Sequence, residues 1–315
     1  MVMRRRRVGR AGCVARALLL DQIIGDPRSP YHPVAVFGRT MERYERRFWK
    51  DSKLSGAIYT LVGCTLSVAA GAALERVIGG GRALLASTCI ASASKSLLDT
   101  AGEVGRLLEA GRLEDARVAL GALVGRECAS LDSEEIARAV IESVGENLSD
   151  AVVGSVVWAM ILGARGVVVH RAVNTMDAMV GHKSARFERF GWASARLDDV
   201  MGLPVAYATA LMVIGAAPGR TGQILRSIRY APRSHPSYNA RTCEAAFAGA
   251  LGIELGGSNR YGDRVEDRGR IGSGRRASPE DIDRAVELGR RVVAVTTLVL
   301  LVIDEVTLRS GKGKR

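Results

Sequence analysis

Three acidic residues recur at a spacing that would place their carboxylates along one face of a helix. Glu142, Glu146 and Asp150 stand at positions i, i+4 and i+8 in the segment ESVGENLSD, which leads into an apolar stretch. Like charges at this spacing destabilise a helix by about 0.2–0.5 kcal/mol per pair. The pattern therefore predicts either a bound cation or basic side chains supplied from elsewhere, with a solvated acidic face as the alternative. Mg²⁺ is the cation we expect, because it prefers oxygen ligands and usually arrives with phosphates.

The segment 171–200 offers further groups that could bind metal or phosphate. Asn174 and Asp177 would share one face of a helix that Gly181 ends. Lys183 is an isolated lysine in an arginine-rich chain, and its compact point charge suits a phosphate. Just before the next apolar stretch stand three more charged residues: Arg196, Asp198 and Asp199. Adjacent carboxylates point in different directions on a helix, so the two aspartates do not automatically share one ion.

Two turns contain a histidine. In the first, GDPRSPYHP, Asp26 and His32 could bind a metal or a phosphate, or could serve only to cap the turn. In the second, HPSYNARTCE, a turn leads into a helix whose N-terminus could hold an anion. Its polar residues are His235, Ser237, Asn239 and Glu244. Histidine titrates near neutral pH, so either one could accept a proton during a reaction.

A glycine-rich segment, GGSNRYG, follows at residues 256–262 and contains Asn259 and Tyr261. It matches neither the GxxxxGK[ST] phosphate-binding loop nor the GxGxxG dinucleotide fingerprint. By itself the segment is a weak indication of ligand binding, and we expect it to be a loop.

Composition and charge exclude several classes of protein. The 315 residues are 47% hydrophobic and only 5% aromatic, which argues against a disordered chain and against a β-sandwich. The five cysteines form no CxxC pair, so neither a disulfide framework nor a zinc site is indicated. The formal net charge of +12 suits an anionic membrane surface or an anionic substrate. We expect no nucleic-acid partner, because no helix-turn-helix, zinc finger or RNA-binding strand motif accompanies the charge.

Four apolar stretches indicate a membrane protein. A transmembrane helix needs about 20 apolar residues, with a range of about 17–25. The stretch at 56–74 meets this requirement, and so does 203–217 together with its uncharged flanks, since residues 200–219 carry no charge. The stretch at 151–164 is less complete and 292–303 is short. Two weaker candidates are interrupted by charged residues: 12–24 and 83–98. For the short stretches the alternative is a buried helix of a soluble protein.

We therefore predict an all-α, polytopic integral membrane protein with about four to five membrane-associated helices and large polar helical loops. No internal repeat divides the chain, so residues 1–315 are expected to form a single membrane-embedded domain with basic tails at both ends. The basic tails favour a cytoplasmic position for both ends, and we expect a multi-pass protein of the cell membrane.

Taken in order, the polar motifs resemble those of the adenosylcobinamide-phosphate synthase family of cobalamin biosynthesis, the CobD/CbiB group. The resemblance covers most of the chain, from about Leu18 to Ile303. The motifs that carry it are LLLDQIIGDP with HPVAVFG, ESVGENLSDAVV, RAVNTMDAMVGHK, FGWASARLDDV, HPSYNA with EAAFAGALGIELGG, and YG with IG. Any one of them would be weak evidence, but the ordered set is specific.

The resemblance implies an integral membrane enzyme that forms an amide between adenosylcobyric acid and (R)-1-amino-2-propanol O-2-phosphate, or aminopropanol. The product would be adenosylcobinamide phosphate, or adenosylcobinamide. ATP and Mg²⁺ would be required, and the adenosylated corrinoid would be a substrate rather than a cofactor. The implied partners are the two substrates, membrane lipid and other membrane-bound enzymes of cobalamin assembly.

For such an enzyme we expect ATP to convert the corrinoid carboxylate into an acyl phosphate, which the amine then attacks. Magnesium would lie on the ladder of Glu142, Glu146 and Asp150, joined by Asp198 or Asp199.

The other candidate residues are assigned to phosphate binding, proton transfer and substrate binding. Lys183 and Arg196 would neutralise phosphate. His32 or His235 would accept a proton from the amine. The residues expected to bind or orient the substrates are Asp26, Asn174, Asp177, Ser237, Asn239, Glu244, Asn259 and Tyr261.

The chain departs from the family pattern in three places. Where the family usually reads HPSPNAGxPE, this chain has Tyr238, Arg241 and Cys243 in place of Pro, Gly and Pro. Gly154-Ser155 stands where the family usually has AP. The family usually has an arginine after the proline that corresponds to Pro204, whereas this chain has Val205 there. The first and last of these differences affect the fine shape of the site, and with it the amine donor, rather than the class of reaction.

Two other classes of protein fit part of the pattern. A non-catalytic corrinoid-handling membrane scaffold or transporter could share the motifs, although a transporter would be expected to show internally related helix bundles. A peripheral binder of anionic ligands, whose apolar stretches form a soluble core, would be extracted without detergent.

Overall fold

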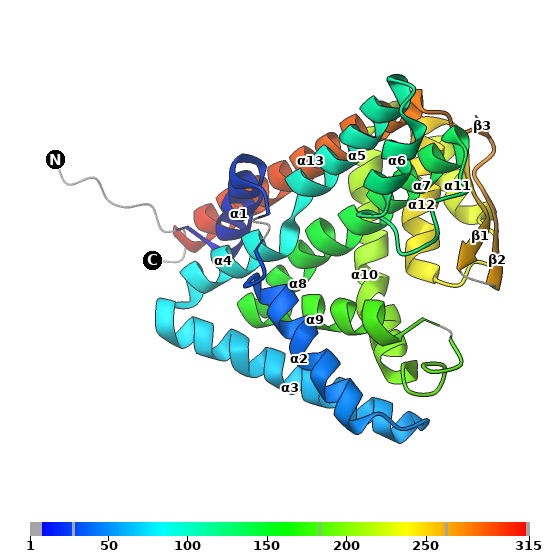
Figure 1. Cartoon of the computed structure of the whole chain (residues 1–315). Coiled ribbons are helices and arrows are strands. Elements are labelled where there is room, and N and C mark those ends of the chain that lie inside the picture. Colours follow the sequence, from blue (N-terminus) through cyan, green and yellow to red (C-terminus); the bar gives the residue numbers. More distant parts are fainter. Residues whose placement is uncertain (1–7, 27–28, 183, 262–263, 313–315) are drawn as a thin grey trace. The chain divides into compact units, whose positions relative to one another are not determined.

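Two compact units make up the protein, and the chain passes between them more than once (Figure 1). The computed structural model describes residues 8–26, 29–182, 184–261 and 264–312. Unit 1 comprises the residues up to 93, 154–201 and those from 296 onward, and unit 2 comprises 94–153 and 202–295. Two helices, α10 (Trp192–Ala216) and α13 (Glu280–Lys312), contribute to both units. The expected single domain stays a prediction.

Unit 1 is built from helices that pack around α3 and α9. Its complete helices are α1 (Arg10–Ile24), α2 (Pro33–Phe48), α3 (Lys53–Ile78), α4 (Gly80–Ser92), α8 (Gly154–Leu162) and α9 (Ala164–Val180). Tyr59, Met176 and Phe190 are fully buried in its core. The predicted end of a helix at Gly181 is confirmed, because α9 stops one residue earlier and Gly181 follows as its cap.

A stripe of small residues lets α3 approach its neighbours closely. Its buried positions include Gly56, Thr60, Gly63, Ser67 and Gly71, which recur every third or fourth residue and so share one helix face. A Cβ atom at residue 63 would overlap the sulfur of Met176, and one at residue 71 would lie 3.0 Å from the Cα atom of Arg165. These glycines therefore allow α3 and α9 to pack closely, as small residues do between membrane helices.

The outer face of α3 is apolar, in contrast to its small-residue face. Leu54, Leu61 and Val77 are 65–80% exposed. Among the described residues, α3 and α10 are the two helices that are long and apolar enough to cross a membrane. In an apolar 18-residue segment of each helix, only 28% is buried in α3 and 39% in α10. The apolar residues of a core helix in a soluble protein are, in contrast, mostly buried. Length and exposure together support a membrane association of these two helices.

The expected count of about four to five membrane helices is not confirmed. The stretch at 151–164 is divided, because the π-helical turn η1 (Ser149–Val153) is followed by the nine-residue α8 and a break at Gly163. The stretch at 83–98 is divided at Ala93, between α4 and α5 (Ser94–Glu109). The remaining two stretches lie within helices, 12–24 in the 15-residue α1 and 292–303 in α13, whose apolar part is flanked by charged residues.

Unit 2 surrounds the helix α12 (Tyr238–Leu251), which is buried from Thr242 to its end. The other complete elements are α5, α6 (Leu113–Leu120), α7 (Ser133–Leu148), η2 (Pro218–Arg220) and α11 (Thr221–Tyr230). A Cβ atom at Gly249 of α12 would lie 2.6 Å from the Cα atom of Ile224 in α11. On the α7 side, the ring of Phe247 lies 3.3 Å from the position of a Cβ at Gly145. A glycine on α12 thus lets α11 pack close to it, and a glycine on α7 makes room for the ring of Phe247.

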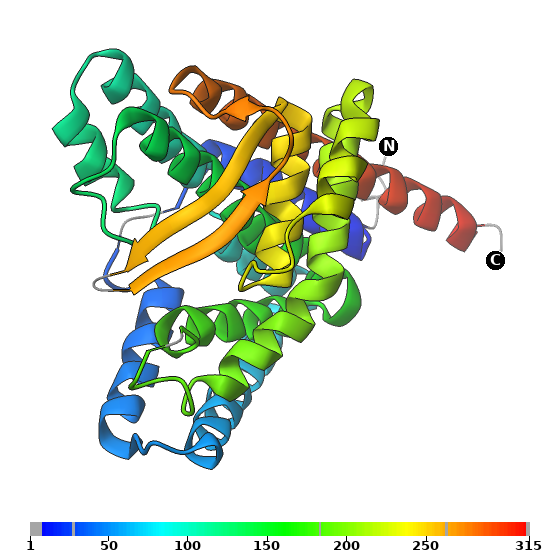
Figure 2. The same ribbon diagram turned by 90° about the vertical axis from the view of Figure 1, so that its right-hand side faces the viewer.

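A small sheet corrects the all-α expectation for an otherwise mostly helical chain. β1 (Ile253–Tyr261) pairs antiparallel with β2 (Arg264–Ile271) and parallel with β3 (Arg275–Arg276), in the order β2-β1-β3. The register shifts between Gly256 and Ser258, where Gly256 and Gly257 have positive φ angles that favour glycine. The expected glycine-rich loop is therefore a bulged hairpin, which packs on α7 and α12 (Figure 2).

We expect the substitution Gly56→Val to destabilise unit 1, because its Cβ atom would overlap the backbone carbonyl of Phe190. Overpacking of a dense interior typically costs about 1–3 kcal/mol. Thermal unfolding in detergent, followed by tryptophan fluorescence, should show a lower midpoint for this variant. Gly80→Ala is the matched control in the same unit, since nothing lies within 4 Å of a Cβ atom there. Equal midpoints for the two variants would contradict the close contact.

Candidate functional site

Two of the polar motifs lie in unit 2, on α7 and on the turn that begins α12. Asp132 and Glu135 form a capping box at the start of α7: Asp132 Oδ1 accepts the Glu135 N–H at 2.8 Å, and Glu135 Oε2 accepts the Asp132 N–H at 3.0 Å. Ser237 caps α12 by accepting the N–H of Ala240 at 3.2 Å. The predicted turn into a helix is thereby confirmed, with His235 two residues before the cap.

Glu142 is contacted by basic side chains and a backbone N–H of the protein itself, and its assignment as a magnesium ligand stays a prediction. Its buried carboxylate accepts a hydrogen bond from Arg126 Nη2 at 3.3 Å through Oε2, and from the Gly256 N–H at 2.8 Å through Oε1. Arg138 Nη1 lies 3.8 Å from Oε1. Burial and the charge of Glu244 raise the pKa of Glu142, although both arginines oppose the shift. Both oxygens therefore have donors within the protein, so the basic side chains that the sequence left open as partners are present at this residue.

The ladder loses its regular spacing after Glu146. α7 ends at Leu148 and the π-helical turn follows, so Asp150 does not continue the α-helical repeat. Glu146 is partly buried, and its pKa is raised to about 8, first by burial and then by the carboxylates of Glu244 and Asp150. Arg268 opposes this shift only in part. Without a cation nearby, Glu146 therefore retains a proton at neutral pH.

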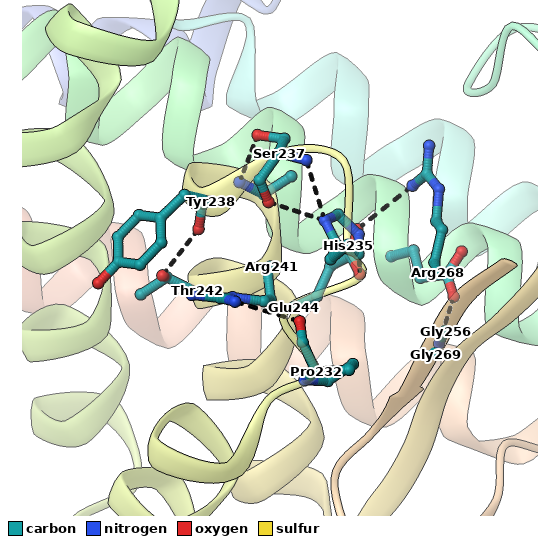
Figure 3. Close-up of polar contacts among 12 residues, drawn as sticks. Pro232, His235, Ser237, Tyr238, Arg241, Thr242, Glu244, Gly256, Arg268 and Gly269 are labelled. Carbon is teal, nitrogen blue, oxygen red and sulfur yellow. Dashed lines mark hydrogen bonds and ion pairs between the residues drawn. The ribbon is translucent and has the colours of Figure 1, made fainter. Parts of the chain in front are cut away.

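The carboxylate of Glu244 lies among buried polar side chains (Figure 3). Its Oε2 is 3.4 Å from His235 Nε2, and its Oε1 is 3.6 Å from Arg268 Nη1. The side chains of Glu244 and His235 are both 0% exposed. The other ring nitrogen, His235 Nδ1, lies 2.7 Å from the carbonyl oxygen of Ser237, which orients the ring. Within the described structure neither oxygen of Glu244 accepts a hydrogen bond, so its contacts are ion pairs at longer range.

The β1–β2 hairpin adds polar groups beside Glu244. Arg268 Nε lies 3.4 Å from Glu266 Oε1, and Glu266 is paired across the hairpin with Asn259. Asn259 is only 3% exposed, and neither polar atom of its side-chain amide forms a hydrogen bond with the residues that the structure describes. We refer to these residues together as the polar cluster: Glu146, His235, Glu244, Asn259, Glu266 and Arg268.

The other predicted residues of unit 2 have simpler surroundings. Ser237 is used as the helix cap. Asn239 lies in the first turn of α12, where its Cγ atom is 3.0 Å from the position of a Cβ at Gly202. Tyr261 is the last residue of β1, and its side chain lies outside the described part of the structure.

Asp26 and His32 lie between α1 and α2 in unit 1. His32 Nε2 is 3.0 Å from Asp26 Oδ1, so the two side chains are paired within one turn. Pro33 begins α2 directly after His32, a position that proline favours because its ring presets the backbone for a helix. This arrangement fits the turn-capping interpretation that the sequence left open.

The remaining candidates also belong to unit 1. On α9, Arg171 Nη1 donates to Asn174 Oδ1 at 3.3 Å. On α10, Arg196 Nη1 donates to Asp199 Oδ2 at 3.1 Å, and both side chains are largely exposed. Two further candidates, Asp177 of α9 and Asp198 of α10, lie on the same helices as these pairs, and Lys183 lies outside the described residues.

A ready-made metal site is not found in the described parts of the chain: no three His, Cys, Asp or Glu side chains are grouped to hold an ion. Both oxygens of Glu142 have donors within the protein, as described above. At Glu146 burial first, and then the carboxylates of Glu244 and Asp150, raise the pKa, so a bound cation would favour its ionised form.

Sequence reasoning missed the arginines that pair with the acidic residues. Arg138 stands four residues before Glu142 on α7, so the i, i+4 rule could have found this pair. Arg126 lies outside any helix, and Arg268 lies in the strand β2. No local pattern connects these two arginines to their carboxylates.

We expect Arg126→Met to destabilise unit 2 by about 3 kcal/mol, because it leaves the buried Glu142 carboxylate without its closest cation. The double variant Arg126→Met/Glu142→Gln should recover most of this loss, since no buried charge then remains unpaired. Arg112→Met, which breaks an exposed pair with Asp115, is the control and should change stability by less than about 1 kcal/mol. Chemical denaturation in detergent measures all three, and additive effects of the two substitutions would contradict the pairing.

The chain is similar to known proteins over nearly its whole length. Residues 14–289 match the model of the family described as CobD/Cbib protein. A cobalamin biosynthesis protein CobD of Mycobacterium tuberculosis (strain ATCC 25618 / H37Rv) is 40% identical over 302 residues, covering 93% of this chain and 96% of that protein. Proteins of the same name from Pelobacter propionicus and Rhodobacter capsulatus are 38% and 35% identical, and the matches cover 95% and 92% of this chain and 96% of each relative.

No solved structure matches the chain. The family model and the relatives nevertheless cover α7, α12 and the hairpin that form the polar cluster. This protein therefore belongs to the CobD/CbiB family of cobalamin biosynthesis proteins.

Proposed function

We propose that this protein is an amide ligase that joins adenosylcobyric acid to (R)-1-amino-2-propanol O-2-phosphate, or to aminopropanol, with conversion of ATP to ADP and phosphate. Its membership of a cobalamin biosynthesis family supports the substrates. The observation that supports catalysis is the polar cluster of unit 2, where Glu244 and Asn259 are buried with polar atoms that the described residues do not satisfy. Such groups cost stability, and a role in binding substrate accounts for them.

Amide formation requires an activated carboxyl group, because a carboxylate does not accept an amine at neutral pH. In the proposed reaction a carboxylate oxygen of the corrinoid attacks the terminal phosphorus of ATP, and ADP leaves. The amine nitrogen then attacks the acyl carbon, and inorganic phosphate leaves with the former carboxylate oxygen. The protein must therefore hold an amine, accept a proton from it and keep water away from the acyl phosphate.

The polar cluster provides groups for the second half of this reaction. His235 is oriented through Nδ1 by the Ser237 carbonyl, so that Nε2 faces Glu244 in a buried setting. We propose His235 as the proton acceptor in preference to His32, which is already paired with Asp26. For phosphate binding we continue to propose Arg196 and Lys183 of unit 1. For substrate binding we continue to propose Asn174 and Asp177 of the same unit.

Magnesium would neutralise phosphate oxygens when it is bound together with ATP. Glu146 is the ladder residue that we propose as a ligand, with Asp150, Asp198 and Asp199 as further candidates. Because Mg²⁺ usually keeps waters and substrate oxygens among its ligands, one or two protein carboxylates are enough. The described residues contain no group of three His, Cys, Asp or Glu side chains, which is compatible with a site that uses only one or two protein carboxylates.

We also propose that the protein passes through the cell membrane more than once. The exposed apolar side chains of α3 and α10 support two spans. A further apolar surface occurs on α13, where Leu298, Val302 and Val306 are more than half exposed.

Purified protein in detergent, supplied with adenosylcobyric acid, aminopropanol phosphate and Mg·ATP, is expected to form the amide together with an equal amount of ADP. Mass spectrometry detects both products. Omitting ATP, or replacing it with a non-hydrolysable analogue, should abolish the amide. Corrinoid binding without product from either phosphorylated or free aminopropanol would contradict the proposal and favour a membrane scaffold.

A further inference from the structure

Among the side chains that the structure describes, the polar cluster of unit 2 has fewer basic than acidic groups. Arg126 and Arg138 are used by Glu142. Arg268 is shared between two carboxylates, Glu244 at 3.6 Å and Glu266 at 3.4 Å. Glu146 lies close enough to Glu244 for the charge of Glu244 to help raise its pKa. The cluster is therefore suited to a positively charged ligand.

The atoms without hydrogen bonds in this cluster are mainly acceptors. Within the described structure they include both oxygens of Glu244, the side-chain oxygen of Asn259 and Nε2 of His235, together with one donor, Nδ2 of Asn259. All three side chains belong to residues that are more than nine-tenths buried. When Nδ1 of His235 donates its proton to the Ser237 carbonyl at 2.7 Å, Nε2 carries a lone pair and is an acceptor as well. A ligand that satisfies this set must donate several hydrogen bonds.

A primary ammonium group has this combination of charge and donors, since it carries one positive charge and three N–H groups. Resting on the ligase function proposed above, we propose that the polar cluster binds the primary ammonium group of the acyl acceptor, with Glu244 and Asn259 as its hydrogen-bond acceptors and His235 Nε2 as the group that takes its proton.

The proton balance of the reaction agrees with this assignment. An ammonium nitrogen has no lone pair and cannot attack the acyl carbon. Transfer of one proton to His235 Nε2 frees the lone pair, and Glu244, 3.4 Å away, stabilises the imidazolium that forms. The amine then attacks, the C–N bond forms and the C–O bond to phosphate breaks. The second proton leaves the nitrogen with the departing phosphate.

Other ligands fit the cluster less well. A phosphate group would be repelled by the carboxylates of Glu244 and Glu266, so the phosphate of the donor must be bound elsewhere. A water molecule could satisfy some of the acceptors but would supply no charge, and it is therefore an outcome that the test must distinguish.

The first experiment measures binding of the donor and needs no turnover. Isothermal titration of aminopropanol phosphate into the purified, full-length protein should show about 10- to 100-fold weaker binding to Glu244→Gln than to the wild type, because a hydrogen-bonded charge is lost. Glu254→Gln is the matched control: this residue pairs with Arg270 at 3.3 Å on the same hairpin but outside the cluster. With the wild-type protein, propanediol phosphate, which lacks the amine, should bind more weakly by the same factor.

The second experiment separates the amine site from the activation of the carboxylate. Hydroxylamine is uncharged at neutral pH and traps an acyl phosphate as a hydroxamate without needing an ammonium site. With adenosylcobyric acid and Mg·ATP, Glu244→Gln should still form the corrinoid hydroxamate at close to the wild-type rate. Its kcat/KM for aminopropanol phosphate should fall by about 10- to 100-fold.

The outcomes distinguish failure of this inference from failure of the ligase function. Equal binding of the amine and propanediol phosphate by the wild type would overturn the ammonium site even if Glu244→Gln did not fold. Equal losses of hydroxamate and amide in a folded Glu244→Gln protein would also overturn it and leave the ligase intact. Amine-dependent binding in a wild type that forms neither hydroxamate nor amide would support the site and contradict the ligase.

Discussion

The need to place several carboxylates inside unit 2 is the constraint on which its structure depends. A buried carboxylate is stable only if it is paired or protonated, because desolvation of its charge is costly. Glu142 is paired with two arginines and a backbone N–H. Glu146 is kept from ionising at neutral pH by burial and by neighbouring charge. Glu244 has ion pairs but no hydrogen bond among the described residues. A bound ligand would supply the hydrogen-bond donors for its carboxylate.

The elements around these carboxylates are shaped to bring their partners close. The positive φ angle of Gly256 belongs to the bulge in β1, where its N–H donates to Glu142. Arg138 of α7 donates to the carbonyl oxygens of Gly256 and Ser258, so it joins the hairpin to the helix that carries the ladder. Close packing of α12 against α11 and α7, through Gly249 and Phe247, fixes the helix that carries Glu244. Local backbone geometry and long-range charge pairing therefore support one another.

The parts of the structure that could be predicted from sequence are those set by local rules. The turn into α12 and the end of α9 at Gly181 follow from capping chemistry. The ladder correctly indicated that basic partners or a cation would be needed. The π-helical turn before α8 and the break at Ala93 could not be predicted. The length and hydropathy of an apolar stretch do not reveal where the hydrogen-bonding pattern of a helix changes. Arg268 was missed because only the fold brings it to Glu244.

The proposed reaction requires that the corrinoid carboxylate be phosphorylated before an amine attacks it. An oxygen-18 transfer measurement tests this most directly. Adenosylcobyric acid labelled in the reacting carboxylate is incubated with the protein, aminopropanol phosphate and Mg·ATP, and the released phosphate is analysed by mass spectrometry. The account predicts one oxygen-18 atom in each inorganic phosphate formed with the amide. Unlabelled phosphate, or label found in AMP instead, would contradict it.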